Sequence, residues 1–309
     1  MQVSSLPIFN YFSSIIGIRR SETTFLAIGR RWTDNLDYLV RFFRVKPDLF
    51  ELTLNHLEKC QKLTHKHLQE IVEVIGDAQD SEICIVYQLG YTLLEIIESK
   101  KFVSNSEITA LLSHLQAGLS FQKSRLGTEN NFFDEWNVFQ SKDKFTIGAS
   151  LPIHHSQLIL PLSKNFQHLD CEFRPSPAFL PPEMLSEMSI DCETTDMYSL
   201  GVIALIAMGG KEPLQLKLGS ADKKMLKKEE YEVIIDEIIK NVKDNYNAKL
   251  ITAVQKLMAD HQRPCIEETI SDGADKHRVM SPVALSTFHT FVNGKILEPG
   301  PNSSGHHGE

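Results

Sequence analysis

The feature that most constrains the fold is a helix-length segment that is apolar on all sides, Met197–Ala207, directly preceded by Asp196. A helix that is apolar all round must be surrounded by other elements, because none of its faces suits water. An aspartate at the start of such a helix must be hydrogen-bonded, since an unpaired buried charge is costly. We therefore expect a layered helical domain in which Asp196 caps a buried central helix.

Composition narrows the functional classes. The chain has 309 residues, 42% of them hydrophobic and 23% charged, which is typical of a globular protein with a sizeable core. The net charge of -8 argues against binding to nucleic acid or to anionic membranes. Five widely spaced cysteines without a C-x-x-C pair favour reduced, cytosolic thiols over disulfides or zinc. No apolar run approaches the roughly 20 residues that a bilayer span needs, and the N-terminus lacks the basic region of a signal peptide.

The first part of the chain alternates strands with one helix. The stretch Ser4–Lys46 is strand-like, above all Tyr38–Val45, which is rich in aromatic and β-branched residues. Phe50–Lys62 has the apolar spacing of a helix. Two further strand-like runs, Ile71–Ile75 and Ile83–Tyr87, are separated by turn residues.

The remainder is mainly helical. Ser106 is expected to open a helix over Glu107–Lys123, in which one apolar stripe consists of Ile108, Leu111, Leu112, Leu115 and Leu119. Further predicted elements are a pair of short strands within Phe132–Ile147, an irregular proline-rich stretch over Leu151–Pro182, and amphipathic helices over Lys223–Lys243 and Lys249–Asp260.

These patterns predict a bilobal α+β fold, with a small β-rich N-lobe that holds one helix and a larger, mainly helical C-lobe. We place the N-lobe at residues 1–89, the C-lobe at 90–298 and a disordered Gly/Ser/Pro/His tail at 299–309.

Three segments, taken in order, resemble the protein kinases. Pro181-Pro182-Glu183, Asp196–Gly201 and Leu250–Pro264 are similar in order and spacing to the kinase motifs A-P-E, D-x-W-S-x-G and L-x(6)-D-x-x-x-R-P. The resemblance implies a protein-kinase-like fold with an ion pair between Glu183 and Arg263. It also implies that Asp196 holds the backbone of the catalytic loop.

A more specific resemblance is carried by four segments: Pro175–Leu185, Asp191–Gly201, Gly118–Phe121 and Ser281–Phe291. They are similar to the SCY-like family of N-terminal kinase-like proteins, and the resemblance as a whole covers Tyr38–Phe291. The resemblance implies a cytoplasmic role in vesicle trafficking at Golgi and endosomal membranes, with clathrin or coatomer coat components as partners. In that family a helical-repeat region follows the kinase-like domain. Since this sequence ends at Glu309, we expect a fragment, an isoform or a reduced member.

The kinase positions that hold phosphate are altered. Of the Gly-rich loop only Gly17 is present, and without the other glycines the backbone cannot approach phosphates closely. We expect Arg19 and Arg20 to be solvated surface residues. The strand lysine corresponds to Arg41, which is bulkier and forked. Three residues could be its helix partner, and the sequence does not choose among them: Glu51, His56 and Glu58.

The catalytic loop and the metal site are altered as well. The catalytic base corresponds to Phe132, which cannot accept a proton, although Asp134 lies two residues later. Asn137 matches the metal-binding asparagine. Where D-F-G should follow the strand, the chain has Gly148, Ala149 and Ser150, so that segment offers no carboxylate to magnesium. These departures put ATP and magnesium binding in doubt as well as catalysis.

The sequence therefore predicts a pseudokinase without a cofactor that serves as a scaffold for other proteins. It would bind no nucleic acid and would meet membranes only through its partners. One alternative is a weakly active, atypical ATP-dependent serine/threonine kinase that uses Asn137 and Asp134. Another is a helical interaction protein whose motifs match by chance, in which Glu183 and Arg263 would lie apart.

Overall fold

The structure is a computed structural model and describes residues 7–20, 23–93, 95–96, 103–127, 135–141, 144–151, 159–160, 172–173, 192–210 and 228–258. Contacts divide the chain into Met1–Asp275 and Lys276–Glu309, and every described residue belongs to the first unit. The predicted tail at 299–309 lies outside the described residues.

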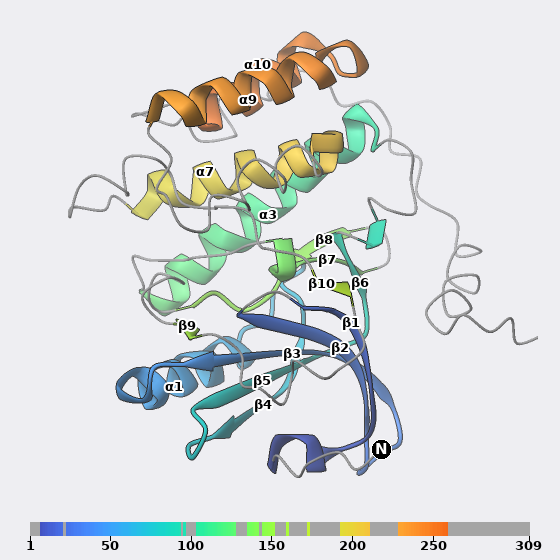
Figure 1. The fold of residues 1–309 in the computed structure, drawn as a ribbon, viewed down its shortest axis with the longest axis vertical. Helices are drawn as coiled ribbons and strands as arrows, with labels where there is room; N and C mark the ends of the chain where they lie inside the picture. The colour runs from blue at the N-terminus through green and yellow to red at the C-terminus, as the bar shows by residue number, and fades with distance from the viewer. Residues whose placement is uncertain are drawn as a thin grey trace, which may run out of the picture. The chain divides into compact units, whose positions relative to one another are not determined.

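A twisted sheet forms the first part of the structure (Figure 1). Its antiparallel strands are β1 (Phe12–Arg20), β2 (Thr24–Arg31), β3 (Asp37–Val45), β4 (Ile71–Asp77) and β5 (Glu82–Tyr87), in the order β1-β2-β3-β5-β4. Two short strands extend it. β9 (Ile159–Leu160) pairs antiparallel with the end of β3, and β10 (Glu172–Phe173) pairs parallel with the end of β1.

The central strand β3 is buried on both faces, which explains its run of large apolar residues. Alternating residues of a strand point to opposite faces. Accordingly Leu39 and Phe43 join one core with α1 (Phe50–Gln61), whereas Val40 and Phe42 join a second core. The helical turn η1 (Pro7–Tyr11) contributes Ile8 to that second core.

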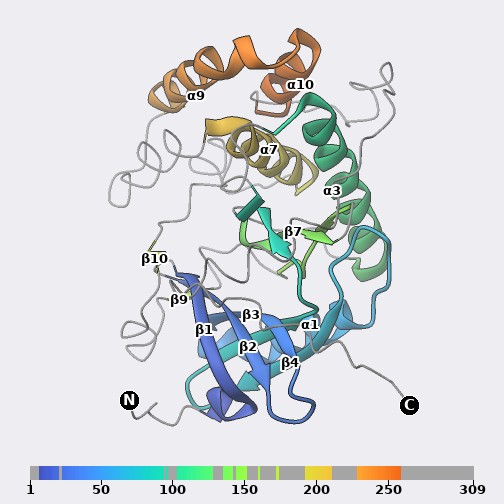
Figure 2. The same cartoon turned by 90° about the vertical axis from the view of Figure 1, so that its right-hand side faces the viewer.

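The helical part is built in layers, which Figures 1 and 2 show from two sides. Its helices are α3 (Asn105–Leu126), α7 (Cys192–Leu205), α9 (Lys228–Val242) and α10 (Ala248–Met258), and a small sheet consists of β6 (Tyr91–Thr92), β7 (Val138–Ser141) and β8 (Lys144–Ile147). α7 packs between α3 and α10, and α3 also packs on β8. Residues 198–208 are all buried, as the all-round apolar pattern predicted.

Several other predicted elements are confirmed within a few residues, including β3, α1, β4, β5 and the pair β7–β8. The predicted apolar stripe of α3 is buried along its whole length. For the two later helices, the structure gives α9 and α10 shorter described bounds than the sequence predicted. None of the described helices combines the length and apolarity needed to cross a bilayer.

Two local predictions were wrong. α3 is capped by Ser104 rather than opened by Ser106. The Ser104 hydroxyl accepts from the Glu107 N–H at 3.3 Å, and the Glu107 carboxylate accepts from the Ser104 N–H at 2.9 Å. This reciprocal capping box satisfies two donors at once, which a cap at Ser106 could not do. The stretch predicted to be irregular contains the strands β9 and β10. β10 pairs with the edge strand β1, and β9 pairs with the end of β3, beyond the last residue of β3 that pairs with β2.

Gly118 allows α3 to approach β8 closely. A Cβ atom on this residue would lie 2.7 Å from the backbone oxygen of His67 and 2.8 Å from Ile147 Cγ2. Neither neighbour can move away cheaply, since one is backbone and the other is buried.

Gly118→Ala is therefore expected to destabilise the fold by about 2 kcal/mol, because overpacking outweighs the gain in helix propensity. Urea unfolding measures the change. Ser120→Ala, on an exposed position of the same helix, is the control and should leave stability nearly unchanged. A Gly118→Ala variant as stable as the control would contradict the close packing.

Candidate functional site

The structure brings together, between the sheet and the helical part, three positions that the sequence analysis matched to kinase motifs. Arg41 lies in the middle of β3, opposite Leu26 of β2 and Ile85 of β5. Asn137 ends the short helical turn η3 (Glu135–Asn137), and Ala149 follows β8. All three side chains are buried, so this site is a part of the core.

Asn137 is the centre of the site. Its Oδ1 accepts a hydrogen bond from the Arg41 guanidinium, and its Nδ2 donates to the Ala149 carbonyl at 3.2 Å. Its own carbonyl accepts from the Gly148 N–H at 2.8 Å. The amide oxygen of Asn137, which the sequence analysis matched to a magnesium ligand, therefore accepts a hydrogen bond from a cationic side chain.

The segment Gly148–Ser150 is held by residues from distant elements. The Ala149 N–H donates to the Tyr87 hydroxyl at 3.2 Å, and Gln122 of α3 donates to the Gly148 carbonyl at 2.9 Å. A Cβ on Gly148 would lie 2.8 Å from the Tyr87 hydroxyl and 2.9 Å from a ring carbon of Phe139. No side chain at position 148 fits beside these rings, so this packing admits only glycine.

Of the three candidate helix partners in α1, only His56 is buried, whereas Glu51 and Glu58 are exposed. Its Nε2 lies 3.5 Å from the Ser150 hydroxyl. Burial lowers the pKa of His56 to about 4, and a hydrogen bond with the Ser150 backbone opposes that shift only in part. His56 is thus neutral at physiological pH and ties α1 to the segment after β8. Arg41 itself is hydrogen-bonded to Asn137.

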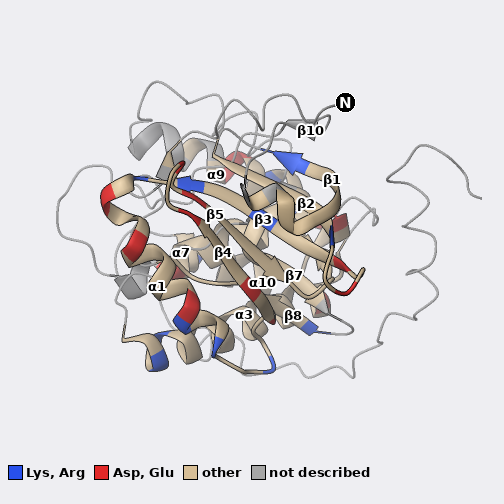
Figure 3. Ribbon diagram, turned by 90° about the horizontal axis from the view of Figure 1, so that it is seen from below, with Lys and Arg blue, Asp and Glu red and all other residues tan. Residues whose placement is uncertain are grey.

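The equivalent of the Gly-rich loop is an ordinary strand in its described part. Gly17 lies within β1 opposite Ala27, and a register shift follows it before Arg19. The expectation that Arg19 is a solvated surface residue was wrong, because its side chain is buried and Arg20 is partly buried. β10 pairs beside both arginines, which end β1 where Figure 3 shows basic residues. The strand β10 thus covers the end of the outer edge of β1, which the sequence analysis did not predict.

Of the three residues to which the sequence analysis gave a structural role in the kinase motifs of the helical part, the structure describes only Asp196. Asp196 is buried, but it lies inside α7, which begins four residues earlier at Cys192, so the prediction that it caps the helix was wrong. Phe132, Asp134, Glu183 and Arg263 lie outside the described residues. Within the described part of the chain, no group of three or more His, Cys, Asp or Glu residues could hold a metal ion.

Sequence reasoning missed Tyr87 and Gln122, and it named Ser150 only for its lack of a carboxylate, not for its contact with His56. A signal existed for Gln122, because it continues the apolar stripe of α3 three residues after Leu119 and is therefore a polar residue on a buried face. Nothing in the local sequence marks Tyr87 or Ser150, whose partners lie 62 and 94 residues away.

Comparison with known proteins gives a distant similarity to a protein kinase. No protein-family model matches the chain. Over 167 residues, 52% of its length, it is 27% identical to ribosomal protein S6 kinase alpha-4 of Mus musculus, and the same figures hold for that protein of Homo sapiens. The chain spans 20% of the length of these relatives. Together with the antiparallel sheet and the helices, this distant similarity supports a protein-kinase-like domain, and the SCY-like assignment stays a prediction.

The pKa of His56 predicts a pH-dependent stability. A histidine whose folded pKa of about 4 lies below its ordinary 6.5 stabilises the fold above pH 6.5 and loses that contribution as the pH falls toward 4. At pH 4.5 the loss should amount to about 2 kcal/mol. Replacing His56 by Gln keeps a polar side chain without titration.

Urea unfolding of wild type and His56→Gln at pH 7 and pH 4.5 tests this expectation. The variant should lose about 2 kcal/mol less than wild type between the two pH values. His65→Gln is the matched control, because His65 is more exposed and should change the difference less. Equal pH dependence of wild type and His56→Gln would show that His56 is not buried as described.

Proposed function

We propose that this chain is a catalytically impaired protein kinase-like domain, a pseudokinase, that acts as a protein-binding scaffold. The observation that carries the proposal is the hydrogen bond from the Arg41 guanidinium to the amide oxygen of Asn137. A scaffold needs a stable fold and an accessible surface, and it does not need an open nucleotide cleft.

Magnesium binding at this position is disfavoured for two reasons. Magnesium requires near-octahedral oxygen ligands, and the segment Gly148–Ser150 supplies no carboxylate. In addition, a magnesium ion on Asn137 would have to displace the guanidinium and leave two positive charges close together in the core. Repulsion between charges is strong where water is excluded.

Phosphate binding is disfavoured by the strand geometry near Gly17. A phosphate-binding loop needs successive backbone N–H groups turned toward the ligand. Gly17 instead pairs with Ala27 in the β1–β2 ladder, so its backbone groups belong to the sheet. The described part of this region therefore offers no cradle of amides.

The biological setting rests on the sequence resemblance to the SCY-like family. On that basis we place the protein in intracellular vesicle trafficking, in the cytoplasm at Golgi or endosomal membranes, with vesicle-coat proteins as partners. The net charge of -8 is compatible with protein partners and disfavours nucleic acid.

A second candidate function is a weakly active, atypical serine/threonine kinase. Two observations favour it, namely the retained Asn137 and the 27% identity to a protein kinase. In this case Asp134 would accept the proton of the substrate hydroxyl, and the contact between Arg41 and Asn137 would have to open when nucleotide binds.

A thermal-shift titration with ATP distinguishes the two functions. A ligand at 100 times its dissociation constant stabilises the folded state by about 2.7 kcal/mol. The pseudokinase should show no magnesium-dependent shift with ATP beyond the shift that magnesium alone produces. A reproducible ATP shift that requires magnesium would count against the scaffold and for the kinase.

Phosphate transfer to a generic protein substrate is the complementary measurement. Wild type and Asp134→Asn should both incorporate no label above background. Activity in wild type that Asp134→Asn abolishes would establish the kinase function and overturn the proposal.

A further inference from the structure

Three large apolar side chains are exposed together at one end of the sheet. Trp32 is 66% exposed and Leu36 is 57% exposed, both in the β2–β3 turn, and Tyr11 at the end of η1 is 46% exposed. The Trp32 N–H donates to the Tyr11 carbonyl at 3.1 Å, so the turn and η1 are neighbours. Single exposed apolar residues are normal, but a group of this kind marks an interaction site. We call these three residues the tip patch.

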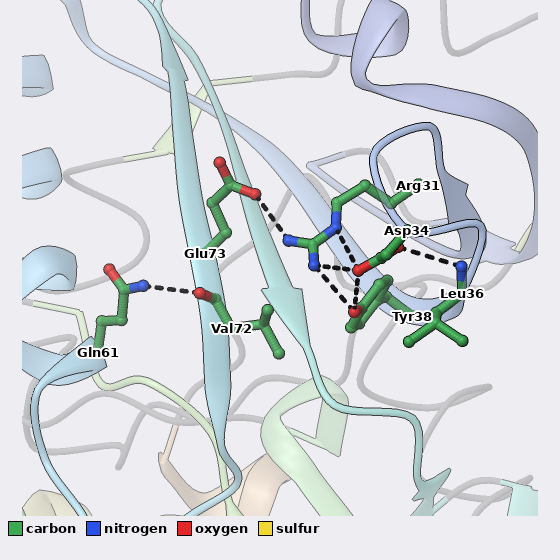
Figure 4. Close-up of polar contacts among 7 residues, drawn as sticks. All are labelled: Arg31, Asp34, Leu36, Tyr38, Gln61, Val72 and Glu73. Atoms are coloured by element: carbon green, nitrogen blue, oxygen red, sulfur yellow. Dashed lines mark hydrogen bonds and ion pairs between the residues drawn. The ribbon is translucent and has the colours of Figure 1, made fainter.

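The turn that carries Trp32 and Leu36 is held by hydrogen bonds within the turn, one of which, from the Leu36 N–H to Asp34, is drawn in Figure 4. The Asn35 N–H donates to the Arg31 carbonyl at 2.9 Å, and the Arg31 N–H donates to the Leu36 carbonyl at 3.0 Å. The Leu36 N–H donates to Asp34 Oδ1 at 3.1 Å, and Asn35 adopts a left-handed φ of 56°. Asparagine tolerates that conformation. A turn that is already ordered loses little conformational entropy when a partner binds.

Charged residues of both signs flank the turn of the tip patch and form its rim. The Arg30 guanidinium donates twice to the Asp37 carboxylate, at 2.8 and 3.0 Å. Arg31 is hydrogen-bonded to Asp34 and donates to Glu73 at 3.2 Å. The hydrogen bond from Arg31 holds the pKa of Asp34 well below its usual range, so this carboxylate stays charged at physiological pH. With two arginines and three carboxylates, the net charge of this rim is almost neutral.

We propose that the tip patch is the contact surface of a symmetric homodimer. In a two-fold contact a surface meets a copy of itself, so its rim must carry both signs of charge to avoid repulsion. The rim of the tip patch has this property, whereas the chain as a whole carries a net charge of -8. Two copies therefore meet here with little repulsion. A nucleic acid or an anionic bilayer would instead require a basic rim. The homodimer is independent of the pseudokinase assignment.

The two tryptophans of the chain allow a direct test. Trp136 is only 1% exposed, so iodide quenches mainly the fluorescence of Trp32. On serial dilution of the full chain, sedimentation equilibrium should show a dimer passing into a monomer, and iodide quenching should increase over the same concentrations. A monomer at every concentration, with constant quenching, would overturn the proposal.

Trp32→Glu should weaken the dimer at least about tenfold, because buried aromatic residues dominate interface energies. Leu36→Glu should act in the same direction and serves if Trp32→Glu does not fold, which circular dichroism shows. Val233→Glu is the matched control, since Val233 of α9 is also 66% exposed, and it should leave dimerisation unchanged.

Two other outcomes contradict the homodimer. A dimer that Trp32→Glu and Leu36→Glu leave intact would use a different surface. A monomer whose Trp32 becomes protected from iodide only on addition of phosphatidylcholine and phosphatidylserine vesicles would show that the tip patch binds membranes instead.

Discussion

The contact between Arg41 and Asn137 is the interaction on which the arrangement of the site depends. A guanidinium in the core must be hydrogen-bonded, because an unpaired buried charge costs several kcal/mol. Asn137 supplies an acceptor for it, and the remaining groups of Asn137 bind the segment after β8. One amide therefore joins the central strand of the sheet to the helical part. The positions that the sequence analysis matched to metal-binding and phosphate-binding residues of kinases are thus hydrogen-bonded to one another.

The regular elements could be predicted from the sequence because their signals are local. β3 contains consecutive aromatic and β-branched residues, and α3 repeats apolar residues at helical spacing, so both follow from periodicity. The predictions were wrong where burial or the bounds of an element depend on residues that are close in space but distant in the sequence. Arg19 is buried beside a strand that comes more than 150 residues later, and α7 extends beyond the aspartate that seemed to start it.

The same division holds for the site. The absence of a carboxylate at Ala149 is a property of the sequence and could be read directly. That Arg41 bonds Asn137 could not be read, since 96 residues separate them and either side chain could have faced other partners. His56 could be named only as one of three candidates, and burial of one face of α1 selects it. The sequence can therefore show that a catalytic group is missing more easily than it can predict which contacts form in its place.

A filled site has a consequence for how such a domain could work. An active kinase must open and close its cleft to exchange nucleotide, which limits how firmly its two parts can be joined. In this chain the pairs Arg41–Asn137 and His56–Ser150 join β3 and α1 to the residues around β8. Contacts of this kind favour a fixed arrangement of these elements, which agrees with the proposed role of the domain as a scaffold that binds partners on its outer surfaces. The exposed β2–β3 turn is such a surface, because it is ordered by its own hydrogen bonds and presents apolar side chains that the fold does not need for its core.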